Sequence, residues 1–153
     1  MSFLFLFASS VAAASVSGWL IDNECWAQPD HVGFDGAKLD TAPQDHTVHC
    51  LLLKVCKESG FFLRDNVTGT LQNVGSFDTA GNAKVIAYLE TLQDSQKNVY
   101  VTVEADVAGT GESAKLSNVA TIKSKTSPAP SAAATLLLSP IVVAMVAAAA
   151  RFN

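Results

Sequence analysis

The sequence predicts an α+β domain that is mainly β, with two helices and with five strands closed into a small OB-like barrel. Residues 99–107 alternate apolar and polar side chains, which is the pattern of a strand with one buried face. Five strand-like segments occur, with a helix-like segment between the third and the fourth, and OB-type folds have this order. A long insertion, residues 23–59, follows the first strand and contains every cysteine and histidine of the chain.

The first half of the domain contains three of the strands and one helix. Residues 16–22 are a mainly apolar run that predicts the first strand. Residues 46–58, inside the insertion, predict a helix that ends before Gly60, because glycine commonly follows the last helical residue. Residues 61–64 and 70–74 predict a hairpin. In an OB-type fold the insertion would occupy the first inter-strand loop, which borders the ligand-binding face.

The second half predicts one helix and a closing hairpin. Residues 82–92 place apolar side chains at helical spacing. Residues 99–107 and 114–122 are alternating segments joined by a turn that contains Gly-Thr-Gly. This turn lacks the Gly-Lys-Ser/Thr end and the following helix of a phosphate-binding loop, so it does not predict nucleotide binding.

Apolar segments at both ends predict an extracellular, membrane-anchored protein. The apolar run in residues 1–17 is shorter than a membrane span and ends in small residues, which favours a cleaved signal peptide. Residues 124–131 are a linker of serine, proline and alanine, and residues 132–153 are a hydrophobic anchor signal. The domain between them, residues 18–123, is expected on the extracellular face of the plasma membrane.

Two kinds of anchor remain open at the C-terminal end. Small residues, a short spacer and an apolar tail favour a glycosylphosphatidylinositol (GPI) anchor, with Ser124 or Ser131 as the attachment residue. A retained transmembrane helix is the alternative, because Arg151 would supply a positive charge on the cytoplasmic side. Pro140 and the alanine-rich composition argue against that helix.

Charge and one motif limit the expected partners. All 14 acidic residues lie between residues 18 and 124, whereas Lys125 and Arg151 lie outside, so this segment is acidic and nucleic acid is not an expected partner. The acidic stretch of the insertion is interpreted as a solvated loop, since its spacing matches no calcium-binding pattern. Asn66 begins an Asn-Val-Thr sequon, which predicts N-glycosylation.

The cysteines and histidines of the insertion are the candidate site. On a helix over residues 46–58, one face of about 120° would carry most of these side chains. A disulfide within this helix is not expected, because six residues of helix separate two Cα atoms by about 9 Å. The residues that share the face are His46, His49, Cys50, Leu53 and Cys56.

Three interpretations of this cluster stay open. In the first, Cys25 forms a disulfide with Cys50 or Cys56, which an oxidising compartment favours, and one cysteine is left over. In the second, Cys25, His46, His49, Cys50 and Cys56 supply ligands for zinc or copper. In the third, a cysteine and a histidine act as nucleophile and base. The sequence has no CxxC pair and no catalytic signature around either cysteine, so the disulfide is preferred.

These residues resemble a pattern found in small secreted or periplasmic OB-like modules of uncharacterised function. The first strand reads Gly-x-hydrophobic-x-Asp-x-x-Cys from Gly18 to Cys25. A segment with His46, Cys50 and Cys56 follows, then a glycine, and the closing hairpin over residues 98–123 is similar as well. The resemblance implies the fold and the cysteine framework, and it implies no established activity.

The sequence therefore predicts a non-enzymatic, glycosylated surface domain that is anchored to the membrane and binds an unidentified extracellular ligand or has a structural role. The alternative is an extracellular metal- or haem-binding protein that uses the cysteine and histidine cluster. The surface-domain hypothesis predicts that no cofactor is bound. The metal-binding alternative predicts a bound zinc or copper ion.

Overall fold

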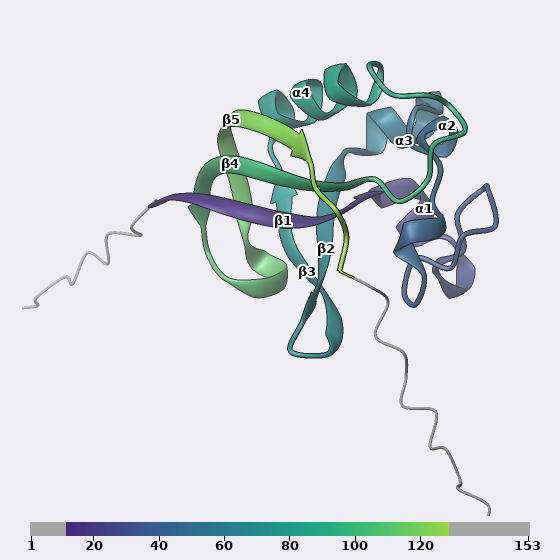
Figure 1. Ribbon diagram of the computed structural model, residues 1–153, viewed down its shortest axis with the longest axis horizontal. Coiled ribbons are helices and arrows are strands. Elements are labelled where there is room, and N and C mark those ends of the chain that lie inside the picture. The colour runs from purple at the N-terminus through teal and green to yellow at the C-terminus, as the bar shows by residue number, and fades with distance from the viewer. Residues whose placement is uncertain (1–11, 129–153) are drawn as a thin grey trace, which may run out of the picture.

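The computed structural model describes residues 12–128, which form five strands, one longer helix and several short helices (Figure 1). The strands make one mixed sheet that closes into a ring in the order β1-β2-β3-β5-β4. The predicted α+β class and the five strands are confirmed. The strands are β1 (Ala12–Asp22), β2 (Phe61–Val67), β3 (Thr70–Phe77), β4 (Tyr100–Ala108) and β5 (Lys115–Ser124).

Strand β1 has two neighbours in the ring. Residues 12–19 pair antiparallel with β4, and residues 19–22 pair antiparallel with β2. Trp19 belongs to both pairings, and at the preceding residue, Gly18, a Cβ atom would be 2.7 Å from the carbonyl oxygen of Arg64. Only glycine allows β1 and β2 to approach so closely. A short parallel pairing of β3 with β5 completes the ring.

The main hydrophobic core lies inside the ring. Alternate strand residues contribute to it, among them Leu20, Leu63 and Val101, which are at most 1% exposed. Helix α4 (Thr79–Leu89) connects β3 to β4 and lies over one side of the ring (Figure 1). Its residues Val85 and Leu89 are fully buried in the same core, so α4 and the strands are stabilised together.

A second hydrophobic cluster lies between the ring and the insertion. Its strand residues alternate with those of the main core, so they belong to the opposite, outer face of the sheet. They are nevertheless buried, because the insertion covers the outer face that β1, β2 and β4 share. The members of this outer cluster are Trp19, Ile21, Phe62 and Tyr100 from the strands and Cys25, Ala37, Leu39, Cys50 and Cys56 from the insertion.

The insertion consists of short helices in place of the predicted long one. They are α1 (Asn23–Ala27), α2 (Val48–Leu51) and α3 (Lys54–Ser59). The predicted helix over residues 46–58 is wrong, because Leu53 is extended (φ −56°, ψ 144°) and separates α2 from α3. Thr47 caps α2 by accepting a hydrogen bond from the backbone N–H of Cys50, which leaves His46 outside the helix.

The ends of the described chain bear on the predicted processing. β1 begins at Ala12 and not at residue 16, so residues 12–17 of the predicted signal peptide belong to a strand that is paired with β4. Ser124 is the last residue of β5, and its hydroxyl lies 2.6 Å from that of Tyr88. Residues 1–11, Ser131 and the anchor signal lie outside the described residues. Within residues 12–128, no helix has the length and apolar character needed to cross a membrane.

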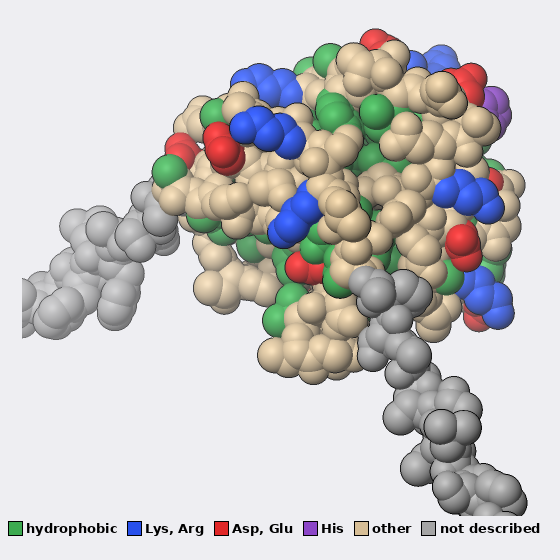
Figure 2. All heavy atoms as spheres, in the orientation of Figure 1, with side chains coloured by type: hydrophobic (Ala, Val, Ile, Leu, Met, Phe, Trp, Pro, Cys, Tyr) green, Lys and Arg blue, Asp and Glu red, His purple; other side chains and the backbone are tan. Residues whose placement is uncertain are grey.

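The surface mixes charges of both signs. On the face shown in Figure 2, basic and acidic side chains are interspersed, and apolar side chains appear between them in small groups. Among the described residues, the most exposed large apolar side chains are Phe34 (52%), Val55 (49%) and Val67 (38%). Phe34 and Val55 belong to the insertion, so its solvent-facing side also carries apolar side chains.

Candidate metal centre

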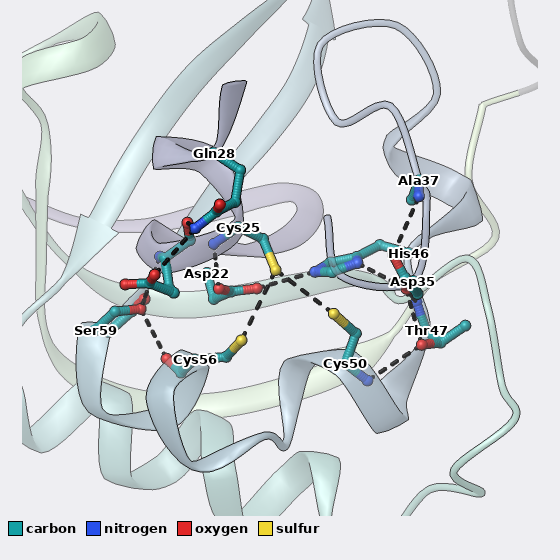
Figure 3. A network of polar contacts seen from close by, with 12 residues as sticks. Asp22, Cys25, Gln28, Asp35, Ala37, His46, Thr47, Cys50, Cys56 and Ser59 are labelled. Atoms are coloured by element: carbon teal, nitrogen blue, oxygen red, sulfur yellow. Dashed lines mark hydrogen bonds and ion pairs between the residues drawn. The ribbon is translucent and has the colours of Figure 1, made fainter. Parts of the chain in front are cut away.

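The insertion and the end of β1 bring sulfur-bearing and polar side chains together in one buried centre (Figure 3). Asp22 ends β1 and caps α1, because its Oδ1 accepts a hydrogen bond of 2.8 Å from the backbone N–H of Cys25. Cys25 lies in α1, Cys50 in α2 and Cys56 in α3, and His46 lies just before α2. All five side chains are at most 1% exposed.

The His46 ring lies between two carboxylates. Its Nε2 is 2.9 Å from Oδ2 of Asp22, and its Nδ1 is 3.0 Å from Oδ2 of Asp35. Thr47 fixes Asp35, because its backbone N–H and its hydroxyl donate to the same oxygen at 2.7 and 2.8 Å. Burial opposes a charged ring, but the hydrogen bonds with Asp22 and Asp35 raise the pKa of His46 to about 11. In the metal-free protein His46 is therefore an imidazolium that donates from both nitrogens.

The sulfur atom of Cys25 contacts those of both other cysteines, and the three atoms form a bent arrangement with Cys25 at its apex (Figure 3). Cys25 Sγ is 3.5 Å from Cys50 Sγ and 3.8 Å from Cys56 Sγ, and all three cysteines are free. A disulfide bond is about 2.05 Å long. Two thiolates bound to one tetrahedral zinc ion at about 2.3 Å are roughly 3.8 Å apart. The predicted pairing of Cys25 with Cys50 or Cys56 is thus not formed in this structure, although Cys25 is next to both partners.

The same contacts set the charges of the thiols and carboxyls. The hydrogen bond from Cys25 and the nearby His46 lower the pKa of Cys50 to about 5, against the effect of burial. Donating to Cys50 and being buried raise the pKa of Cys25, and burial beside Asp22 raises the pKa of Cys56. Although burial opposes it, hydrogen bonding to His46 lowers the pKa of Asp22. At neutral pH the metal-free centre thus holds a thiolate beside an imidazolium.

Two groups of potential metal ligands share Cys25. The donor atoms of Cys25, His46 and Cys50 lie within 4.8 Å of one another, and so do those of Asp22, Cys25 and Cys56. Thiolate and imidazole are preferred ligands of zinc and copper. Asp35 adds the carboxylate that commonly accepts a hydrogen bond from the second ring nitrogen of a metal-bound histidine. The geometry therefore suits a thiophilic metal ion between Cys25, Cys50 and His46.

His49 is the predicted ligand that the structure places elsewhere. It is exposed on α2, whereas Cys25, His46, Cys50 and Cys56 converge inside. The prediction placed His49 with the others because it assumed one regular helix from residue 46 to residue 58. The extended residue Leu53 changes the direction of the chain, so that helical spacing does not decide which side chains meet.

Two aspartates of the centre were missed by the sequence analysis. Asp22 precedes Cys25 by three residues, which is the spacing of an N-cap to the N–H that it accepts, and this spacing was a usable signal. Asp35 belongs to the acidic stretch that was interpreted as a solvated loop. No local pattern marks Asp35, since its role depends on the distant His46 and Thr47.

The predicted glycosylation site lies outside this centre. Asn66 is half-buried in β2, next to the hairpin turn at Thr68 and Gly69, and Thr68 is exposed. Glycosylation of Asn66 stays a prediction.

The chemistry of the centre is the main guide to function. The sequence matches no protein-family model, and searches of curated proteins and of solved structures found no similar protein. Free buried thiols beside one buried histidine and two carboxylates can bind a metal ion or exchange disulfides.

Proposed function

We propose that this protein is a membrane-anchored, extracellular metal-binding protein whose OB-type domain holds zinc or copper between Cys25, His46 and Cys50. The observation that carries the proposal is the convergence of these three buried donors within 4.8 Å, with both sulfur atoms free. Without a metal, the centre has a net negative charge, because the imidazolium of His46 pairs with Asp22 and Asp35 while the thiolate of Cys50 lies beside them. Burying charges without a strong partner is costly, and a bound cation offsets that cost.

An OB-type fold is supported by the topology of the ring. The strand order β1-β2-β3-β5-β4, the parallel contact of β3 with β5 and the helix between β3 and β4 agree with this fold. OB-type domains bind their ligands on the face of strands 2 and 3 and in the adjoining loops. Here the insertion after β1 covers part of the outer face and carries the metal ligands, so the centre lies beside the usual ligand region.

Metal binding at this centre would release protons. To hold a metal, His46 would lose the Nε2 proton that now faces Asp22, and Nδ1 would keep its hydrogen bond to Asp35. Cys25 also loses its proton, because thiolates and not thiols bind metals. Cys56 or Asp22 is then close enough to supply a further ligand next to Cys25. The affinity is therefore expected to rise with pH.

Native mass spectrometry of the full chain in detergent tests the proposal, with thiol alkylation before and after denaturation. The expected result is the added mass of one metal ion and three thiols that are alkylated only after unfolding. His46→Ala should lose the metal, and His49→Ala is the matched control that should retain it. A protein that is two hydrogens light, carries no metal and has one thiol to alkylate after unfolding would contradict the proposal.

That contrary result would support a second candidate function, a disulfide-stapled surface module that binds an extracellular ligand. The position of Cys25 Sγ between the other two sulfur atoms favours it, since either pairing needs only a small movement. In both cases the segments at the two ends of the chain support an extracellular, anchored location. Release of the protein from intact cells by a phosphatidylinositol-specific phospholipase would support the GPI anchor over a transmembrane helix.

A further inference from the structure

A small cavity leads to one of the three cysteines. Its volume is about 130 Å³, and it is lined by Phe34, Asp35, His49, Cys50 and Leu53. Cys50 is the one cysteine in this lining, although its side chain is only 1% exposed. Phe34 and His49 are exposed residues of the same lining, so the cavity opens at the surface of the insertion. A small molecule that enters there meets Cys50 before the other sulfur atoms.

The sulfur atoms behind Cys50 are arranged for transfer. Cys25 Sγ is 3.5 Å from Cys50 Sγ and 3.8 Å from Cys56 Sγ. Both Cys25 and Cys56 are fully buried. Each neighbouring pair is in contact, so a disulfide can form between either pair without a large movement of the backbone.

From this arrangement we infer that the metal-free centre is a thiol–disulfide exchange site for small aliphatic disulfides, with Cys50 as the entry thiol, Cys25 as the resolving thiol and Cys56 as a second acceptor. The inference concerns the cysteines of the proposed metal centre, but it does not depend on metal binding. It also gives a role to the third cysteine. A single disulfide or a metal site with two thiolates would use only two of the three.

The reaction is balanced in three steps. The thiolate of Cys50 attacks one sulfur of the small disulfide, which forms a mixed disulfide and releases one small thiolate. The thiolate of Cys25 then attacks Cys50 Sγ, which forms the Cys25–Cys50 disulfide and releases the second small thiolate. Cys25 gives its proton to one released thiolate and water protonates the other, so the protein is oxidised by two electrons and the small disulfide is reduced to two thiols. Finally Cys56 attacks Cys25 Sγ and frees Cys50, with no further oxidation.

The lining of the cavity points to a small and cationic disulfide. Its volume excludes large substituents, and the Asp35 carboxylate in the lining favours a positively charged group. Cystamine, a short disulfide with an ammonium group at each end, is therefore the probe. Its carboxylate counterpart of similar length, dithiodiglycolate, is the matched control and should react more slowly.

The test uses the full chain in detergent, stripped of metal by a chelator and treated with cystamine, with mass spectrometry of the intact protein and of its peptides. The wild-type protein should lose two hydrogens and then gain one cysteamine on Cys50, once Cys56 has freed that thiol. Cys25→Ser should stop at a cysteamine adduct on Cys50. Cys56→Ser should stop at the Cys25–Cys50 disulfide, with no adduct. Cys50→Ser should remain unmodified on the same time scale.

Oxidation of Cys50→Ser as fast as the wild-type protein, or a first adduct on Cys25 or Cys56, would overturn the inference. If the variants do not fold, the order of alkylation in the wild-type protein provides the second measurement, since a limiting amount of iodoacetamide should label Cys50 first. Labelling of Cys56 first would overturn the inference as well. Because the protein is metal-free, these results are independent of the metal proposal. If both hold, added zinc should stop the exchange.

Discussion

A single carboxylate oxygen, Oδ2 of Asp35, connects His46 to the start of helix α2. It lies 3.0 Å from Nδ1 of His46 and accepts hydrogen bonds from the backbone N–H and the hydroxyl of Thr47. Thr47 in turn accepts a hydrogen bond from the backbone N–H of Cys50. The orientation of the His46 ring and the position of Cys50 are therefore set by one short chain of contacts.

The first prediction concerns Asp35→Asn. The amide keeps the size of the side chain, but it no longer holds the negative charge that orients Nδ1–H of His46. We expect zinc affinity to fall by roughly 10- to 100-fold, as is typical when the hydrogen-bond partner of a metal-bound histidine is changed. Competition with a chromophoric chelator measures this. Asp45→Asn, an exposed change in the same insertion, is the control, and an equal loss in both variants would contradict the role of Asp35.

The second prediction concerns the pH dependence of the metal-free protein. The pKa of His46 is raised to about 11 on folding, so its stabilisation is complete below about pH 6.5 and is lost as pH rises toward 11. The pKa of Cys50 is lowered to about 5, so its stabilisation is complete above the pKa of an unfolded thiol and is lost as pH falls toward 5. Between pH 7 and 8, His46 lowers and Cys50 raises the free energy of unfolding as pH increases, so their two contributions to its pH dependence cancel.

Cys50→Ser removes the contribution of the thiolate to the pH dependence of unfolding and leaves the contribution of His46. The free energy of unfolding of the variant should fall by up to about 1.4 kcal/mol per pH unit between pH 7 and 8, the value for one proton. The metal-free wild-type protein should show little change over this range. Urea unfolding at several pH values measures both proteins. A variant as independent of pH as the wild-type protein would mean that His46 is not charged in the folded state.

The third prediction concerns Gly18, where a Cβ atom would be 2.7 Å from the carbonyl oxygen of Arg64. The contact is with backbone, so Gly18→Ala cannot be relieved by a rotamer change and must separate β1 from β2. We expect a loss of roughly 1–3 kcal/mol in the free energy of unfolding, as for overpacking in a core. Ser15→Ala, at an exposed position of the same strand, should change it little. Equal stability of the two variants would show that the strands separate without cost.

The fourth prediction concerns the start of the mature chain. Residues 12–17 pair with β4, and their removal would leave that edge of β4 open. We therefore expect the protein isolated from the cell surface to begin at or before Ala12, as determined by mass spectrometry of its N-terminal peptide. A chain that begins at Gly18 would show that the first half of β1 is dispensable.

The positions of most strands along the chain were predictable because they depend on local patterns. Alternation marks β4 and β5, and helical spacing marks α4, although its start was placed three residues too late. The first half of β1 was not recognised, because Ala13, Ala14 and Ser15 are exposed and show no alternation. Its strand conformation comes from pairing with β4, which a local sequence pattern does not reveal.

The sequence was enough to predict most residues of the candidate site, but not how they are arranged in space. Restriction of all cysteines and histidines to one insertion was enough to nominate Cys25, His46, Cys50 and Cys56. Their arrangement depends on the break at Leu53, where burial of side chains against the outer face of the sheet overrides the tendency to continue a helix.

The last prediction ranks the three cysteines by their share in metal binding. Cys25 belongs to both groups of donors, so Cys25→Ser should weaken zinc binding more than either other change. Cys50→Ser should follow, because it removes the thiolate that lies with His46 and Cys25. Cys56→Ser should cost least, since Asp22 can take the remaining position beside Cys25.

Isothermal titration with zinc at pH 7.5 measures this order, with His49→Ala as the variant that should match the wild-type protein. Thermal unfolding in excess zinc gives a second measure, because binding to the folded state raises the Tm in proportion to the logarithm of the affinity. If Cys56→Ser weakened binding as much as Cys25→Ser, the metal would lie between Asp22, Cys25 and Cys56. In that case His46 would be a structural imidazolium that holds two carboxylates together, and not a ligand.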